Sequence, residues 1–310
     1  MDPGTAGAVA VALLAISSSG PLIAYAAAPA LAVAFWRNAG ATVLLTPVSL
    51  IRRRAELVGL FARAGRRTGW YAVLAGVALA AHFAAWTPST KLTSVAASTA
   101  LVTSQPVWQG LIALGQGRRL SALSWLGIGL AVAGAVLTTG ADLGGGSGRA
   151  VLGDVLALLG GMAAAVYTAF GERVRSTAST TTYTTVCYGV CSVLLLAVCL
   201  AGGVRLTGFN PATWLAILAL VFGPQLLGHS LLNYALQRIS ATTISVLILL
   251  ETPGAALIAW LWLGQTPRTA ALPGLLLLMA GVAVVVLGNA RTPRRPAPVS
   301  APPETAPLRK

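Results

Sequence analysis

Charged residues are scarce in this chain of 310 residues, of which only 9% are charged while 56% are hydrophobic. A soluble domain carries about a quarter charged residues, so the composition excludes an ordinary soluble protein. The chain also lacks the paired-cysteine spacing of a zinc site, a phosphate-binding lysine motif and a soluble nucleophile elbow. These absences argue against the usual zinc, nucleotide and hydrolase sites, and we expect neither a cofactor nor a metal.

Long apolar windows fill most of the chain instead. A membrane-spanning helix needs roughly 20 mostly apolar residues, and continuous apolarity favours helices over barrel strands, in which apolar and polar residues alternate. We therefore predict an all-α polytopic membrane protein with about ten transmembrane helices. The predicted spans are residues 6–26, 30–51, 69–87, 93–114, 122–140, 151–171, 181–202, 211–233, 240–263 and 270–289.

The segments between these spans are too short to hold a soluble catalytic domain. The glycine-rich segment 141–149 is expected to be a flexible linker. The proline-rich tail, residues 290–310, is expected to be disordered in the cytosol. Three cysteines, Cys187, Cys191 and Cys199, all fall in the seventh predicted span, where we expect them to pack as small apolar residues.

The net charge of +14 is distributed very unevenly. When the N-terminus is placed inside, sixteen lysines and arginines fall on the inner side and only Lys91, Arg149, Arg205 and Arg268 fall outside. This is the positive-inside bias, which predicts a multi-pass protein of the inner (cytoplasmic) membrane with both termini in the cytoplasm. The basic residues thus indicate orientation and contact with the lipid bilayer, and no nucleic acid partner is expected.

A single offset of 147 residues aligns residues 82–134 with residues 229–281 without a gap. Rare residues coincide under this offset, including the only two histidines of the chain. The matching pairs are His82 and His229, Lys91 and Arg238, Pro106 and Pro253, Gly127 and Gly274, and Gly134 and Gly281. Because each half then has five spans, an odd number, the second half is expected to be inverted relative to the first, an architecture that suits alternating access.

The two halves share a sequence pattern. The first half reads KLTSVAASTALVTSQPVWQGLIALGQGRRLS followed by WLGIGLAVAGAVL, and the second reads QRISATTISVLILLETPGAALIAWLWLGQTPR followed by LPGLLLLMAGVAVVV. Over residues 6–289 the chain resembles the EamA family of the drug/metabolite transporter superfamily. The resemblance implies a first five-helix repeat at residues 1–140, a second at residues 151–289, cytoplasmic termini and a central cavity between the halves.

The chain departs from the family pattern at one place in each half. The acidic residue that usually follows the glycine at the end of the fourth and ninth helices is replaced by Arg118 after Gly117 and by Gln265 after Gly264. The glutamate that precedes a proline in the second half is retained as Glu251, two residues before Pro253.

Ionisable groups at membrane depth are costly and therefore candidates for function. Glu251 lies near the middle of the ninth span, next to the kink expected at Pro253. It is a candidate for substrate or proton binding, and the alternative is a carboxyl that holds two helices together. Arg37 lies in the second span. It is a candidate for binding an anionic group or pairing with Glu251, and the alternative is that it snorkels to the outer interface.

Further candidates occur in pairs four residues apart, on one face of a helix. His82 and Trp86 form one pair, and their repeat equivalents His229 and Asn233 form the other. These four side chains would suit an aromatic or amphipathic solute, with histidine as a proton acceptor, and the alternative is hydrogen bonding between helices. Gln105 and Tyr167 are weaker candidates for the same cavity.

Secondary transport of a small metabolite, amino acid or amphipathic drug-like solute is the expected function, with export favoured and proton coupling as a candidate mechanism. Two alternatives remain open. One is an intramembrane enzyme that uses His82 or His229 with a membrane serine, although no serine lies in a recognisable nucleophile motif. The other is a membrane scaffold or receptor that transports nothing. An enzyme is not the expected outcome.

The predicted orientation can be tested by cysteine labelling. Cysteines placed at positions 53 and 295 should react with a membrane-impermeant thiol reagent only from the cytoplasmic side, because both positions lie in inner basic segments. Labelling of either position from outside would overturn the topology.

Overall fold

The computed structural model describes residues 2–115, 117, 120–145, 148–239, 241–266 and 269–290. Within these ranges the chain is helical and contains no strand. The predicted disordered tail beyond residue 290 lies outside the described residues, as do Arg118 and Arg268.

The helices follow the predicted spans closely. The first half contains α1 (Pro3–Ser17), α2 (Ser19–Tyr25), α3 (Ala30–Arg52), α4 (Arg54–Gly59), α5 (Arg66–Leu92), α6 (Val95–Val102), α7 (Gln105–Gly115) and α8 (Ala122–Gly145). The second half contains α9 (Gly148–Arg175), α10 (Thr180–Ala201), α11 (Pro211–Leu220), the π-helix η1 (Val221–His229), α12 (Ser230–Ala235), α13 (Ala241–Leu247), the 3₁₀-helices η2 (Ile248–Leu250) and η3 (Thr269–Ala271), α14 (Glu251–Leu263) and α15 (Leu272–Ala290).

Seven helical segments of the described chain are long and apolar enough to cross a membrane, and two shorter apolar helices lie at Ala122–Leu137 and Leu272–Val284. The all-helical membrane class is therefore confirmed, whereas the count of ten spans stays a prediction. One expectation is wrong in its extent. The flexible linker predicted at 141–149 is largely helical, because α8 continues to Gly145 and α9 begins at Gly148. Glycine costs only about 1 kcal/mol per residue in a helix, so such an extension is tolerated.

The polarity of the bundle is reversed relative to that of a soluble protein. Large apolar side chains point outward on the long helices, for example Leu14, Val43, Val193 and Leu276. Polar side chains lie inside, and Arg37 is completely buried. A helix that is apolar on its outer face suits lipid, and its interior polar groups then need partners from neighbouring helices.

Four of the spans predicted from the sequence change their helical geometry part-way along. Each change lies where a proline removes the N–H that would bond the carbonyl four residues earlier. The prolines are Pro21, Pro106, Pro224 and Pro253, and the carbonyls belong to Ser17, Val102, Leu220 and Leu249. Pro47 and Pro88 lie inside α3 and α5 without such a break, so proline alone does not decide the outcome.

Two of these breaks meet inside the bundle. The hydroxyl groups of Thr103, between α6 and α7, and Thr252, in α14, are 3.0 Å apart and form a hydrogen bond. Gly161 of α9 lies against the same break, because a β-carbon there would be 2.7 Å from the carbonyl oxygen of Val102. The interrupted helices of the two halves are therefore packed against one another and against α9.

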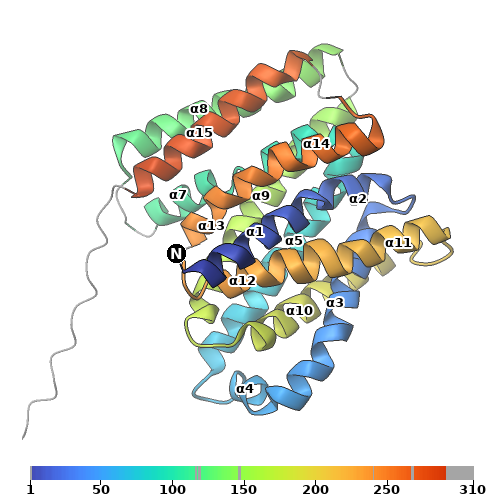
Figure 1. Ribbon diagram of the computed structural model, residues 1–310, viewed down its shortest axis with the longest axis vertical. Coiled ribbons are helices and arrows are strands. Elements are labelled where there is room, and N and C mark those ends of the chain that lie inside the picture. Colours follow the sequence, from blue (N-terminus) through green and yellow to red (C-terminus); the bar gives the residue numbers. More distant parts are fainter. Residues whose placement is uncertain are drawn as a thin grey trace, which may run out of the picture.

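Helices α8 and α15 run side by side along one edge of the molecule (Figure 1). A β-carbon at Gly134 would lie 2.7 Å from the carbonyl oxygen of Gly274, and one at Gly281 would lie 2.7 Å from that of Gly127. The 147-residue offset exchanges these two contacts. The helices are thus antiparallel and meet reciprocally, as surfaces do across a two-fold axis.

These glycines give a test of the packing. Gly134→Ala should lower the free energy of unfolding in detergent by about 1–3 kcal/mol, because the added methyl group meets backbone atoms of α15. The change is measured as a lower apparent melting temperature. Gly129→Ala, on the open side of the same helix, is the matched control. It should leave stability unchanged or raise it by about 0.5–1 kcal/mol, because alanine is the better helix former. Equal behaviour of the two variants would contradict the packing.

Candidate functional site

A cavity of about 40 Å³ lies inside the bundle, between α1, α2, α5, α6, α7, α9, η1, α12, α13, η2 and α14. One water molecule needs about 10–15 Å³ of such space, so the cavity holds a few waters. A metabolite does not fit unless the helices move apart.

The helix breaks place polar residues on the cavity wall. Ser19 begins α2, Gln105 begins α7, His229 ends η1 and Glu251 begins α14, and all four line the cavity. In the bilayer every backbone polar group must find a partner inside the protein. Interrupted helices are therefore tolerated where protein or water surrounds them, and here they surround this cavity.

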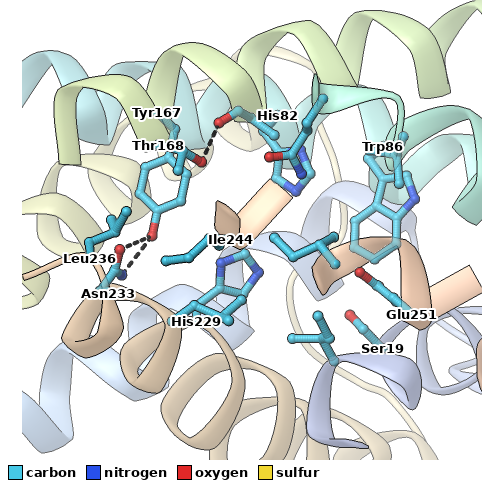
Figure 2. A pocket seen from close by; sticks show the side chains of 16 residues that line it. Ser19, His82, Trp86, Tyr167, Thr168, His229, Asn233, Leu236, Ile244 and Glu251 are labelled. Carbon is cyan, nitrogen blue, oxygen red and sulfur yellow. Dashed lines mark hydrogen bonds between the residues drawn. The ribbon is translucent and has the colours of Figure 1, made fainter. Parts of the chain in front are cut away.

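The middle of the cavity is aromatic (Figure 2). The rings of His82 and Trp86 stack, with centroids 5.5 Å apart and planes inclined by 20°. His82 and its repeat equivalent His229 face each other at 6.4 Å between ring centroids, and Tyr167 lies 6.2 Å from His229. Flat rings on several sides suit a planar or amphipathic solute.

One hydrogen bond fixes the orientation of His82. Its Nδ1 lies 3.0 Å from the carbonyl oxygen of Gly160 in α9. A carbonyl oxygen only accepts, so Nδ1 carries the proton and donates it, and Nε2 of the neutral ring is left as an acceptor. His82 can therefore take up a second proton without giving up this bond.

Tyr167 and Asn233 close one end of the cavity (Figure 2). The tyrosine hydroxyl donates to Oδ1 of Asn233 at 2.9 Å, and Nδ2 of Asn233 lies 2.6 Å from the same hydroxyl. Both side chains are buried. This pair links α9 to α12 directly at that end of the cavity.

Glu251 and Ser19 lie at the opposite end, beside Trp86 (Figure 2). Glu251 is 7% exposed and is the first residue of α14, directly after the 3₁₀ turn η2. It interacts electrostatically with Arg37. No ion pair joins these two residues in the described part of the chain.

Arg37 lies behind Ser19, outside the cavity wall. Its Nε donates to Oε1 of Gln225 at 2.9 Å, its Nη1 donates to the hydroxyl of Ser19 at 3.0 Å, and its guanidinium lies 4.3 Å from the centre of the Phe83 ring. The side chain is 0% exposed. The alternative of snorkelling to the outer interface is therefore wrong, because the guanidinium has partners inside the bundle.

Hydrogen bonds connect the two ends of the cavity behind His229. Nδ2 of Asn233 lies 3.5 Å from the Tyr188 hydroxyl, which lies 3.2 Å from the hydroxyl of Ser230. The Ser230 hydroxyl donates to the backbone carbonyl of Gln225 at 3.3 Å, and the Gln225 side chain accepts from Arg37. A polar network thus runs from the Tyr167 end to the Ser19 end.

Seven of the eight residues singled out in the sequence line this one cavity, and Arg37 touches it only through Ser19. The seven are His82, Trp86, Gln105, Tyr167, His229, Asn233 and Glu251. Their role in substrate binding stays a prediction.

The sequence analysis missed Ser19, Gln225 and Asp154. Ser19 and Gln225 each lie within two residues of a proline inside a predicted span, a signal that could have found them. Asp154 is completely buried in α9. As an acidic residue within the span predicted at 151–171, it also met the criterion that selected Glu251.

The model of the EamA-like transporter family matches residues 5–140 and again residues 151–287. The chain belongs to this family. An EamA-like transporter has a two-repeat architecture, and the two matches lie on either side of the junction between α8 and α9. The family is one of membrane transporters, so transport and membrane location are assigned to the chain with it.

One solved crystal structure aligns with 94% of this EamA-like chain and with 99% of its own chain, at a TM-score of 0.63 and 19% sequence identity. At this identity the likeness shows the fold alone. A comparison with curated proteins found no significant match.

The buried network around Arg37 gives a second test of stability. Arg37→Ala should lower the stability in detergent by about 2–3 kcal/mol, because it leaves the buried Gln225 and Ser19 without their charged partner. Arg52→Ala, at the exposed end of the same helix, is the matched control and should have little effect. A thermal shift measurement that ranks the two variants equally would contradict the assigned network.

Proposed function

We propose that the protein is a secondary transporter that moves a small solute by alternating access to the central cavity. The observation that carries this proposal is a small cavity, lined mostly by buried residues, where the proline-broken helices of both halves meet. A cavity of about 40 Å³ cannot hold a metabolite as it stands. A solute must therefore enter and leave as the two halves move against each other.

The reciprocal contact of α8 with α15 supports an inverted arrangement of the halves. Two antiparallel helices that exchange their contacts under the 147-residue offset are related by an axis perpendicular to both. Such an axis lies in the membrane plane and turns one repeat upside down relative to the other. We take residues 1–140 and 151–289 as these repeats, with both termini in the cytoplasm.

The lining residues support an aromatic or amphipathic solute. Stacked rings form the middle of the cavity, and a carboxylate lies at one end. Glu251 is the one acidic side chain among the residues that line the cavity. In the ranges that the structure describes, Arg37 forms its hydrogen bonds with Gln225 and Ser19 and none with Glu251. We assign Glu251 the binding of a proton or of a cationic group of the solute.

An intramembrane enzyme is disfavoured by the geometry. A nucleophilic serine needs a base within about 2.6–3.2 Å. Among the described residues, the hydrogen bond of His82 goes to the backbone of Gly160, and no histidine–serine bond is found. Export through the cytoplasmic membrane remains our expected direction.

Purified protein in proteoliposomes tests transport itself. Under an imposed pH gradient, uptake should be detectable for at least one member of a panel of amino acids, nucleosides and amphipathic cations. The absence of flux across this panel would count against a transporter.

Glu251→Gln tests the coupling role. This variant should abolish gradient-driven flux while it remains folded, because the amide keeps the shape of the side chain and loses the titrating group. Glu172→Gln, near the end of α9 and outside the cavity wall, is the matched control and should retain flux. Full flux in Glu251→Gln would remove this residue from coupling.

A further inference from the structure

A second, larger cavity lies at the basic end of the bundle. Its volume is about 560 Å³, and we call it the vestibule. The residues that matter for its chemistry are Arg53, Glu56, Arg175, Ser179, Tyr234 and Gln237. The charge distribution places this end in the cytoplasm.

Neighbouring residues at the end of α12 form the wall between the vestibule and the central cavity. Asn233 and Leu236 face the central cavity, whereas their neighbours Tyr234 and Gln237 face the vestibule. Arg175, the last residue of α9, also lines the vestibule, yet it is only 1% exposed. Its side chain is therefore inserted into the wall.

Arg175 is bound on three sides by acceptors. Its Nε donates to the backbone carbonyl of Asn233 at 2.9 Å, its Nη2 donates to Oε1 of Gln237 at 3.1 Å, and its Nη1 donates to the carbonyl of Ala178. The carbonyl of Asn233 is among the last four of α12, which have no partner within the helix. A cation at such a helix end is stabilised by both hydrogen bonding and the helix dipole.

Asn233 is bonded from both cavities. Its carbonyl accepts from Arg175 on the vestibule side, and its amide bonds Tyr167 on the central side. Tyr167 and Arg175 are eight residues apart on α9, a rise of about 12 Å at 1.5 Å per residue. Asn233 of α12 thus bonds both Tyr167, at the central cavity, and Arg175, at the vestibule.

The vestibule itself is not built as an anion site. The backbone N–H of Ser179, at the start of α10, already donates to the carboxylate of Glu56. This contact supplies the negative charge that the beginning of a helix favours. The vestibule is thus a polar compartment whose inner end is formed by the buried Arg175.

We propose that Arg175 is the inner gate of the transporter, a positioning residue whose guanidinium holds the end of α12 against α9 and separates the vestibule from the central cavity. Release of its bond to the Asn233 carbonyl lets α12 move away from α9, and a solute in the vestibule reaches the central cavity. This assignment rests on the proposed transport function for its purpose. The closure it describes can be measured without any substrate.

The test is one-sided labelling of a cysteine in the central cavity. Thr168 lines that cavity and is 5% exposed, so Thr168→Cys serves as the probe. A membrane-impermeant maleimide is applied to inside-out and right-side-out membrane vesicles. The three native cysteines are buried, and the background of each variant is measured in a matched protein that retains Thr168.

Arg175→Ala should raise the labelling rate of the probe from the cytoplasmic side by about tenfold, a typical size for such a coupling, and leave labelling from outside unchanged. Arg173→Ala removes the same charge from an exposed position two residues earlier and should change neither rate. Gln237→Ala removes a single acceptor at an exposed site and should give a smaller increase on the same side. This variant keeps the test valid if Arg175→Ala does not fold.

Unchanged cytoplasmic labelling in Arg175→Ala and Gln237→Ala, or an equal rise from both sides, would overturn the gate. The second result is what a general loosening of the bundle would give. A one-sided rise in a protein that carries no solute in proteoliposomes would instead support the gate and count against the proposed transport.

Discussion

The shape of the cavity depends on the loss of one backbone hydrogen bond in each of four helices. Proline removes an N–H, and in a lipid environment no water replaces it at the outer surface. The freed carbonyls belong to buried residues, where neighbouring helices and polar side chains can compensate. The same interruptions bring Ser19, Gln105, His229 and Glu251 to one place, so the constraint that breaks the helices also builds the site.

Two kinds of contact then hold the broken helices together. Glycines let the backbones of α8 and α15 approach closely, and α9 uses Gly153, Gly160 and Gly161 in the same way against α5 and α6. Polar networks around Arg37 and Asn233 connect α2, α3, α9, α10, η1 and α12. The first kind is dense and rigid, whereas the second consists of bonds that can be exchanged one at a time. A bundle with both can move without losing its packing.

Much of this arrangement could be predicted from the sequence, because long apolar windows and the polar residues, glycines and prolines between them can be recognised without knowledge of the fold. The boundaries of α3, α10 and α15 lie close to the predicted spans, and the coincidence of His82 with His229 indicated two residues that the fold brings together. Glu251 was found because a lone acid in an apolar window is conspicuous.

The remainder could not be predicted because it depends on which helix faces meet. Pro21, Pro106, Pro224 and Pro253 break or distort their helices while Pro47 and Pro88 do not, and no local pattern separates the two groups. Arg37 looked as if it could reach the interface, and only its long-range contacts with Gln225 and Phe83 explain its burial. The burial of Arg175 likewise depends on the backbone carbonyls of Asn233 and Ala178. Every residue has such a carbonyl, so the sequence does not show which ones will accept a bond.

The Arg37–Gln225 bond also sets an order of events during synthesis. Gln225 follows Arg37 by 188 residues, so the ribosome needs about 10–40 s to supply this partner at 5–20 residues per second. During that interval the first half offers the guanidinium the hydroxyl of Ser19 and the ring of Phe83. Helix α3 is therefore made before the strongest hydrogen-bond partner of its buried arginine exists, and the Arg37 network is completed only when η1 has been synthesised.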